Sequence, residues 1–577
     1  MLIFRLFLLI ALITLHGCAS APESQKTFEP VKLTETKSKI IQSDAKTSID
    51  PDVLFMLLTA EIAGQRGQYD VALEGYMEAA KRVDDPRFAE RAAMIAMYMK
   101  NSKKTNDAVS LWLKQDANNV TARKIAAISA LSAGNRELAA QHLTMLLKVD
   151  PAGFESTVLE IANALQKEGK VAVLNEVLDG MAAKNPDKAV IFYVQSILAM
   201  QMKNKALAEA KIEQTLKVQP DWDKALIFQA QLAVFSGNYD QAKKILNAAA
   251  VKYPENGKIK KILAQVLIKS QNYQEASQVY QSVIAAEPND NESRFALGLV
   301  YLQLDQQEKA EDILKKMVGL PEWKDRANFY LGKLEEKREH TEKALSSYEN
   351  VTAGPFVFDA EVAVISLRAK NKQFMEAETR LKQLQSRFPK QKLRTTLLQA
   401  ELYSQQKQYQ KSFDLLTAAL AESPEQKELL YARALTAEHI DRLDVLEGDL
   451  KKIIKKYPDN AEALNALGYS LLDMPGRYAE AEQYLEQALK LHPDEAVILD
   501  SYGWLQFRLG HTAKALDYLQ KAYDKQQENE IAAHLAEVLW VLGRKSEAKK
   551  LFTKAAKESP DDEYLLDFQQ RILNGGE

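Results

Sequence analysis

The sequence predicts an all-α protein, a solenoid of about fifteen helix–turn–helix units, because two columns of residues recur along it with one period. Prolines return every 33 to 35 residues, where each unit would end: Pro151, Pro186, Pro220, Pro254, Pro288, Pro321, Pro355, Pro389, Pro424, Pro458 and Pro493. Upstream, Pro51 and Pro86 are 35 residues apart. Alanines keep the same phase, at Ala208, Ala242, Ala276, Ala310, Ala344, Ala377, Ala481, Ala515 and Ala548. In a helical repeat of this period each unit contacts only its neighbours, so one core extends along the chain.

The stretch from Pro458 to Pro493 illustrates one unit. Its first half places leucines three and four residues apart, on one face of a helix: Leu464, Leu467 and Leu471. Pro475 and Gly476 interrupt that pattern and supply a turn. The second half predicts another helix whose buried face is Ala481, Leu485 and Ala488. We expect the alanines to lie where the two helices approach closely, because a larger side chain would overpack the contact.

This unit resembles the tetratricopeptide repeat (TPR). The leucine-glycine pair of that family is present as Leu297-Gly298, Leu331-Gly332 and Leu467-Gly468, followed at the aromatic position by Tyr301 and Tyr403. The resemblance covers residues 51–570 and implies a right-handed superhelical TPR solenoid. Residues 357–390 and 428–458 match the pattern less well, but the period continues through both.

Charge argues against a nucleic-acid-binding protein. The 577 residues carry a net charge of −3. Basic runs such as residues 451–456 (KKIIKK) have apolar residues between the lysines, which is typical of a solvent-exposed helix face. We therefore expect no nucleic-acid partner.

The N-terminus has the pattern of a secretion signal in residues 1–17. Arg5 precedes an apolar run from Leu6 to Leu15 that is too short to cross a bilayer, which needs about 20 residues. Leu15-His16-Gly17-Cys18 then resembles the processing box of bacterial lipoproteins, and Cys18 is the only cysteine of the chain. The resemblance implies cleavage after Gly17 and acylation of Cys18, including palmitate-like chains, which would anchor the protein to a membrane. The alternative is an uncleaved apolar N-terminus with an incidental cysteine.

The remaining boundaries follow from composition. Ala19 follows the cysteine where aspartate commonly favours the inner membrane, so the lipoprotein resemblance implies an outer-membrane anchor facing the periplasm. Residues 18–49 are mostly polar and predict a flexible tether with a reach of about 30 Å. Residues 50–570 would form the solenoid, with a closing helix from Leu565 to Leu573, and residues 571–577 a disordered tail.

Catalytic motifs are missing from the sequence. The seven histidines show no metal-ligand spacing, and there is no phosphate loop, dinucleotide fingerprint or nucleophile elbow. Since Cys18 is the only cysteine, thiol catalysis and cysteine metal sites are excluded as well. We therefore predict a protein that is not an enzyme, with no cofactor and no metal.

The candidate site is a partner-binding groove. In TPR proteins the second, fifth, ninth and twelfth residues of each unit face the groove. Counting from Ala461, Ala496 and Asn529, the candidate residues are Asn465, Tyr469, Asp500, Trp504, Phe507, Glu537 and Trp540, with His534 beside them. Aromatic side chains at such positions are typical of peptide or helix docking. For Trp504 and Trp540, packing between helices is an equal alternative, whereas Tyr469 favours the groove.

The C-terminal sequence points to a narrower family. The runs LYARALTAEHIDRLDVLEGDLKKIIKKYPDNAEALNALGYSLLD, LDSYGWLQFRLGHTAKALDYLQKAY and IAAHLAEVLWVLGRKSEAKKLF resemble large outer-membrane TPR lipoproteins of proteobacteria. That resemblance implies a binding partner and activator of a periplasmic carboxy-terminal processing protease, which also recruits peptidoglycan hydrolases as substrates.

The leading hypothesis is thus a lipid-anchored, non-catalytic adaptor that holds protease and substrate together. The alternative is a TPR scaffold lipoprotein for exopolysaccharide export or pilus and secretin assembly. Fold alone does not separate these two roles.

Overall fold

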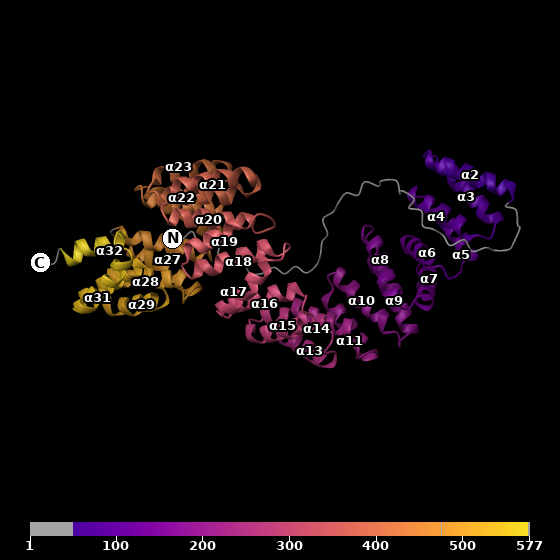
Figure 1. Cartoon of the computed structure of the whole chain (residues 1–577), viewed down its shortest axis with the longest axis horizontal. Helices are drawn as coiled ribbons and strands as arrows, with labels where there is room; N and C mark the ends of the chain where they lie inside the picture. Colours follow the sequence, from indigo (N-terminus) through magenta and orange to yellow (C-terminus); the bar gives the residue numbers. More distant parts are fainter. Residues whose placement is uncertain (1–49, 475, 575–577) are drawn as a thin grey trace. The chain divides into compact units, whose positions relative to one another are not determined.

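A computed structural model describes residues 50–474 and 476–574 of the chain, and all regular structure in these two ranges is helical (Figure 1). The described helices form two compact bodies. We call residues 50–317 the N-terminal body and residues 318–574 the C-terminal body. Each is a succession of antiparallel helix pairs, and the fifteen pairs confirm the predicted number of units.

The helices of the N-terminal body form eight pairs. The pairs are α2 (Pro51–Gln65) with α3 (Tyr69–Arg82), α4 (Pro86–Tyr98) with α5 (Ser102–Gln115), α6 (Val120–Ser132) with α7 (Arg136–Val149), α8 (Phe154–Gln166) with α9 (Val171–Lys184), α10 (Ala189–Gln201) with α11 (Lys205–Val218), α12 (Asp223–Phe235) with α13 (Tyr239–Lys252), α14 (Gly257–Lys269) with α15 (Tyr273–Ala286), and α16 (Asn291–Gln303) with α17 (Gln307–Val318).

The C-terminal body contributes seven pairs and a closing helix. The pairs are α18 (Lys324–Lys337) with α19 (Thr341–Glu349), α20 (Val357–Lys370) with α21 (Phe374–Arg387), α22 (Lys392–Gln405) with α23 (Tyr409–Glu422), α24 (Lys427–Glu438) with α25 (Leu443–Lys456), α26 (Ala461–Ser470) with α27 (Tyr478–Leu491), α28 (Ala496–Arg508) with α29 (Thr512–Lys525), and α30 (Asn529–Val541) with α31 (Lys545–Glu558), followed by α32 (Glu563–Phe568). Short turns of helix are η1 (Pro389–Gln391), η2 (Leu471–Asp473) and η3 (Gln569–Leu573).

One residue with positive φ ends the first helix of every pair. Gly237 (φ 71°) is an example: the next N–H, of Asn238, donates to the carbonyl of Ala233 (2.8 Å) and satisfies a carbonyl at the helix end. The side chain of Asn238 then accepts from the N–H of Gln241 (3.1 Å) and caps α13. Two adjacent residues therefore stop one helix and start the next, which makes the turn short and repeatable.

Small residues let the two helices of a pair approach closely. All nine alanines of the predicted column are fully buried. The glycine of the Leu-Gly pair does the same from the first helix, since a Cβ at Gly468 would lie 2.6 Å from Leu485 Cγ, and a Cβ at Gly332 would lie 2.6 Å from the Tyr348 ring. The expected close contact is thus confirmed on both helices.

The prolines from Pro151 to Pro493 lie in the connections between pairs, as predicted. Pro51 and Pro86 do not belong to this column. Each is the first residue of a helix, α2 or α4, with an aspartate before it that caps the helix N-terminus. Proline is tolerated there because the missing N–H has no acceptor in the first turn. The predicted period is therefore two to three residues out of phase at the first two pairs.

The C-terminus closes the last pair. Leu565 and Phe568 of α32 are buried, and the Phe568 ring lies 5.6 Å from Phe552 of α31. The expected closing helix is present as α32 and η3. Helical residues continue to Leu573, so three residues assigned to a tail from position 571 belong to this cap.

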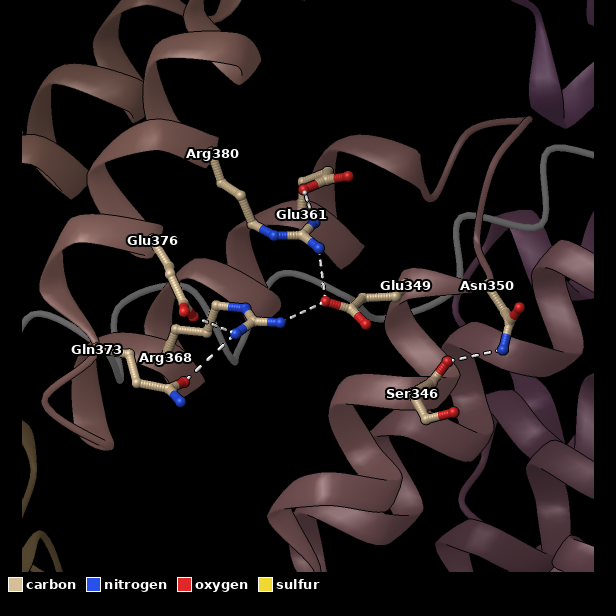
Figure 2. A network of polar contacts seen from close by, with 8 residues as sticks. All are labelled: Ser346, Glu349, Asn350, Glu361, Arg368, Gln373, Glu376 and Arg380. Carbon is tan, nitrogen blue, oxygen red and sulfur yellow. Dashed lines mark hydrogen bonds and ion pairs between the residues drawn. The ribbon is translucent and has the colours of Figure 1, made fainter.

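One second helix is short. Helix α19 spans nine residues, whereas α21 spans fourteen. Figure 2 shows the polar network at its C-terminal end, where two arginines converge on Glu349. Arg368 Nη2 lies 2.8 Å and Arg380 Nη2 2.5 Å from Glu349 Oε1, while Glu376 and Glu361 neutralise the other sides of the arginines. These ion pairs connect α19 to α20 and α21 across the missing turns.

Candidate functional site

The predicted groove residues lie on three successive first helices of the C-terminal body. Asn465 and Tyr469 are on α26, Asp500, Trp504 and Phe507 on α28, and His534, Glu537 and Trp540 on α30. The structure brings most of them together. We call the group formed by Tyr469, Asp500, Trp504, Glu530, His534 and Tyr564 the first-helix cluster.

Tyr469 connects the first helices of two repeats that are not adjacent in sequence. Its hydroxyl donates to Glu530 Oε1 (2.8 Å) and lies 3.4 Å from His534 Nε2. Burial and the neighbouring carboxylates of Glu530 and Asp500 raise the pKa of Tyr469. Its hydroxyl therefore stays protonated and acts as a donor to the carboxylate.

His534 is the centre of the cluster. Its Nδ1 lies 3.1 and 3.0 Å from the two oxygens of Asp500, and its ring stacks on Trp504 at 4.1 Å with 16° between the planes. Burial opposes protonation, but the carboxylates of Asp500, Glu530 and Glu537 outweigh it and raise the pKa of His534. The buried imidazole is thus held where it compensates the acidic side chains around it.

Glu530 and Tyr564 belong to the site but were not among the predicted residues. Tyr564, at the start of α32, hydrogen-bonds Glu530 and contacts His534 edge-on at 6.5 Å. Burial and the charge of Asp500 raise the pKa of Glu530 to about 6. Glu530 could have been found, because it is the second residue counted from Asn529 and satisfies the same positional rule. Tyr564 lies outside the repeats, so no repeat position could indicate it.

Burial shows which predicted residues pack between helices and which stay accessible in a groove. Trp504 is only 9% exposed and packs between helices, and Asp500, His534 and Glu537 are buried as well. Asn465 is also buried, and no described residue hydrogen-bonds its Oδ1.

Tyr469, Phe507 and Trp540 remain half-buried. Most of the predicted residues therefore form internal contacts between repeats, and the surface left for a partner is smaller than expected.

The α30 patch contains one predicted groove residue and two exposed residues that follow it. It consists of Trp540 with Val541 and Leu542, whose exposed fractions are 56% and 40%. The ammonium groups of Lys545 and Lys549 lie 4.8 and 5.7 Å from the Trp540 ring. An aromatic ring with cations over it and aliphatic neighbours is a surface that fits an apolar side chain next to a carboxylate.

A second apolar surface lies on α4 in the N-terminal body. The α4 patch consists of Met94, Met97 and Tyr98, all exposed. Counted back from the positive-φ residue that ends each first helix, Met94 and Met97 occupy the positions of Glu537 and Trp540. Tyr98 contacts Tyr69 at 4.8 Å. Exposed methionines beside tyrosine are typical of surfaces that adapt to protein partners.

The pocket beside α19 is lined by charged side chains that pair with one another. Its volume is about 270 Å³, and its lining includes Glu349 and Arg368. Both side chains are engaged in the network of Figure 2. We therefore assign the pocket a structural role.

Comparison with known proteins identifies the repeats. Sequence models of the tetratricopeptide repeat match residues 233–297, 292–322, 447–496 and 506–572. The chain is 37% identical over 542 residues to the TPR repeat-containing protein PA4667 of Pseudomonas aeruginosa, a match that covers 92% of this chain and 90% of the relative.

The chain belongs to the tetratricopeptide repeat family.

Other similarities are weaker. The TPR repeat-containing protein YpiA of Bacillus subtilis is 28% identical over 180 residues, which cover 31% of this chain and 42% of YpiA. Among solved structures, yeast Tom70 is 14% identical with a TM-score of 0.34, covering 90% of this chain and 99% of Tom70. The thermophilic TPR protein TTC0263 of Thermus thermophilus is 24% identical with a TM-score of 0.28, covering 31% of this chain and 97% of TTC0263.

Family membership indicates a general kind of role for this TPR chain. TPR repeats form scaffolds for protein–protein interaction. Within the described residues no group of histidine, cysteine, aspartate and glutamate could hold a metal ion, and none of the described helices is long and apolar enough to cross a membrane. Cys18 and the tether lie outside the described residues. The expected lipid anchor and outer-membrane location stay predictions.

Proposed function

We propose that this TPR protein is a membrane-anchored, non-catalytic adaptor that brings a periplasmic carboxy-terminal processing protease to cell-wall hydrolases. The observation that supports the proposal is that each of the two bodies carries an exposed apolar patch on a first helix, the α4 patch or the α30 patch. An adaptor needs two separable surfaces, one for each protein that it holds.

The anchor would add to this effect. Acylation of Cys18 would hold the repeats near the outer membrane through the 32 residues 18–49. Proteins bound to both patches would then react as one complex, at an effective concentration that does not depend on their bulk levels. No catalytic group is required of the TPR chain itself.

The test is co-purification with the tagged full-length chain from detergent-solubilised envelopes, followed by mass spectrometry. We expect a serine protease of the carboxy-terminal processing type together with a peptidoglycan hydrolase. Secretin, pilus or polysaccharide-export proteins without a protease would instead support the scaffold alternative. Turnover of a cell-wall substrate by the purified chain alone would contradict a non-catalytic role.

Two patch variants test the adaptor arrangement. Met97→Glu with Tyr98→Ala changes the α4 patch, and Val541→Glu with Leu542→Ala changes the α30 patch; all four side chains are exposed, so both variants should fold. We expect each variant to lose one of the two partners and keep the other. If neither variant changes the set of captured proteins, these patches are not the docking surfaces.

The anchor has its own test. Cys18→Ser removes the only thiol that could be acylated. We expect the variant to leave the outer-membrane fraction while still capturing its partners in solution. A Cys18→Ser chain that stays in that fraction would contradict the lipoprotein assignment without affecting the assignment of the patches.

A further inference from the structure

Helix α2 exposes side chains that the other repeats bury. Leu54, Phe55, Leu58 and Ile62 lie along one side of it with exposed fractions of 45%, 70%, 55% and 49%. With Met56 and Leu57 they make α2 apolar around most of its circumference. A helix of that kind is normally covered on all sides.

The repeat register shows which contact is missing. Phe55 lies twelve residues before Gly67, the positive-φ residue that follows α2. The residues twelve before Lys203, Gly237, Gln271, Gly510 and Gly543 are Ile191, Ala225, Ile259, Ile498 and Ile531, and each is at most 4% exposed. Ile62 likewise corresponds to residues that are almost fully buried, among them Leu198, Val266, Leu505 and Val538.

In those repeats the covering element is the second helix of the preceding pair. Ile498 packs with Ala488 of α27, and Ile531 packs with Ala522 of α29. Within the described residues no helix precedes α2. Phe55 and Ile62 are therefore inter-repeat contact residues without a partner helix in the part of the chain that the structure describes, and with the adjacent Leu54 and Leu58 they define the α2 face.

The chain directly before α2 is poorly suited to cover this face. Residues 34–50 read TETKSKIIQSDAKTSID, in which charged and hydroxyl side chains dominate. The apolar residues of this stretch are Ile40, Ile41, Ala45 and Ile49, so it offers fewer apolar side chains than α2 itself does.

A second copy of α2 fits the face better. Leu54 and Ile62 lie four residues to either side of Leu58. In an antiparallel pair with its two-fold axis at Leu58, each Leu54 would therefore meet the other copy's Ile62. The ends match as well, because Asp50 at the N-cap lies eight residues before Leu58 and would face Arg66 of the other copy, which lies eight residues after it.

We propose that the α2 face is a homodimer interface, formed by antiparallel packing of α2 from two copies of this chain. Each copy would supply the helix that the other lacks, and the contact closes on itself because the same surface is used twice. The dimer extends the proposed function without depending on it, since no partner protein takes part.

Disulfide trapping tests this geometry in the full-length chain. In a Cys18→Ser background, Leu58→Cys introduces the only thiol, and on the proposed axis it should form an intermolecular disulfide on mild oxidation. Val251→Cys is the control, because Val251 is 84% exposed but lies on α13. We expect at least tenfold faster cross-linking at position 58. Equal rates would overturn the proposal.

A mixed experiment tests the direction of packing. Chains carrying Leu54→Cys and chains carrying Ile62→Cys should cross-link to each other faster than either cross-links to itself. Preferential Leu54→Cys self-cross-linking would indicate parallel helices and overturn the antiparallel arrangement.

Analytical ultracentrifugation supplies the reversible measurement. The Cys18→Ser chain should show a monomer–dimer equilibrium between about 1 and about 100 μM, and Leu58→Asp should shift it to monomer with an unchanged circular dichroism spectrum, since Leu58 is exposed. A monomer at all concentrations overturns the proposal. If Leu58→Asp then reduces binding to anionic lipid vesicles, the occupant is a membrane. If Leu58→Cys resists thiol reagents in that monomer, the occupant is the chain's own N-terminal segment.

Discussion

The hydroxyl of Tyr469 and the carboxylate of Glu530 lie 2.8 Å apart although 61 residues separate them. The contact skips the intervening first helix, α28, which contributes Asp500 and Trp504 from one side. Side chains of three first helices and of α32 thus meet at one point. Since that point is buried and contains two carboxylates and an imidazole, its stability depends on pH.

The first prediction is that Glu530→Gln removes a pH-dependent loss of stability. The folded-state pKa of Glu530 is raised from 4.5 to about 6. The protonated carboxyl therefore adds to the free energy of unfolding below pH 4.5, and this stabilisation is lost as the pH rises through 6. The expected loss in the free energy of unfolding is about 2 kcal/mol. The raised pKa of His534 has the same sign and acts above pH 6.5. Hydrogen exchange should therefore show that the α30 amides of the wild type lose protection relative to those of the variant between pH 4.5 and 6.

Tyr469→Phe provides the control for that measurement. The tyrosine hydroxyl lowers the pKa of Glu530 by donating to its carboxylate. Its removal should move the same loss of protection to higher pH. Curves for wild type, Glu530→Gln and Tyr469→Phe that run parallel over this range would show that Glu530 does not titrate in the cluster.

The second prediction separates the two tryptophans. Trp504 is buried against His534, so Trp504→Ala leaves a cavity and should destabilise the C-terminal body by about 3–5 kcal/mol. Trp540 is half-buried under two lysines, and Trp540→Ala should cost clearly less while weakening partner capture. Denaturant unfolding and the co-purification assay check both expectations. Equal destabilisation by the two variants would place Trp540 in the core.

The third prediction concerns glycine at the helix contact. In Gly468→Ala the new Cβ would lie 2.6 Å from Leu485 Cγ and 3.2 Å from the carbonyl of Ala481, so we expect destabilisation by about 1–3 kcal/mol. A Cβ added at Gly448, in the interior of α25, would meet no atom within 4 Å, and Gly448→Ala should stabilise by up to about 1 kcal/mol through helix propensity. Opposite shifts of the thermal unfolding midpoint are the expected result.

Much of the fold was predictable because the same structural constraint acts at the equivalent position of many repeat units. Alanine is needed at the helix contact and proline is favoured between pairs. Because each recurs with the repeat period, both positions could be recognised in the sequence. The first two pairs were misaligned because Pro51 and Pro86 serve as first helical residues, which the proline column alone cannot distinguish from connecting residues.

The candidate site was harder to predict. Positional rules identify the side of a first helix, and two of the residues they selected, Asp500 and Trp504, meet in the first-helix cluster. They do not indicate how completely the neighbouring first helices bury that side. Trp504 is covered by the ring of His534 from a later repeat, and His534 in turn contacts Tyr564 of the cap. These contacts join residues that are far apart in the sequence, so no local sequence pattern predicts them.

The fourth prediction tests a buried ion pair inside one helix pair. Arg433 of α24 holds Asp449 of α25 with two contacts, Nε to Oδ2 at 2.7 Å and Nη2 to Oδ1 at 2.9 Å, and the Asp449 side chain is 2% exposed. Asp449→Ala leaves the guanidinium without its main partner in a poorly hydrated place. We expect a loss of about 3–5 kcal/mol in the free energy of unfolding.

An exposed pair of the same geometry is the matched control. Arg544 contacts Glu547 through the same two guanidinium nitrogens, both at 2.7 Å, but the side chains are 45% and 58% exposed. Glu547→Ala should therefore change stability little, since solvent screens the pair. Denaturant unfolding of both variants at neutral pH compares them directly. If Asp449→Ala costs no more than Glu547→Ala, water reaches Arg433 when its partner is removed, and the pair makes no special contribution to the contact between α24 and α25.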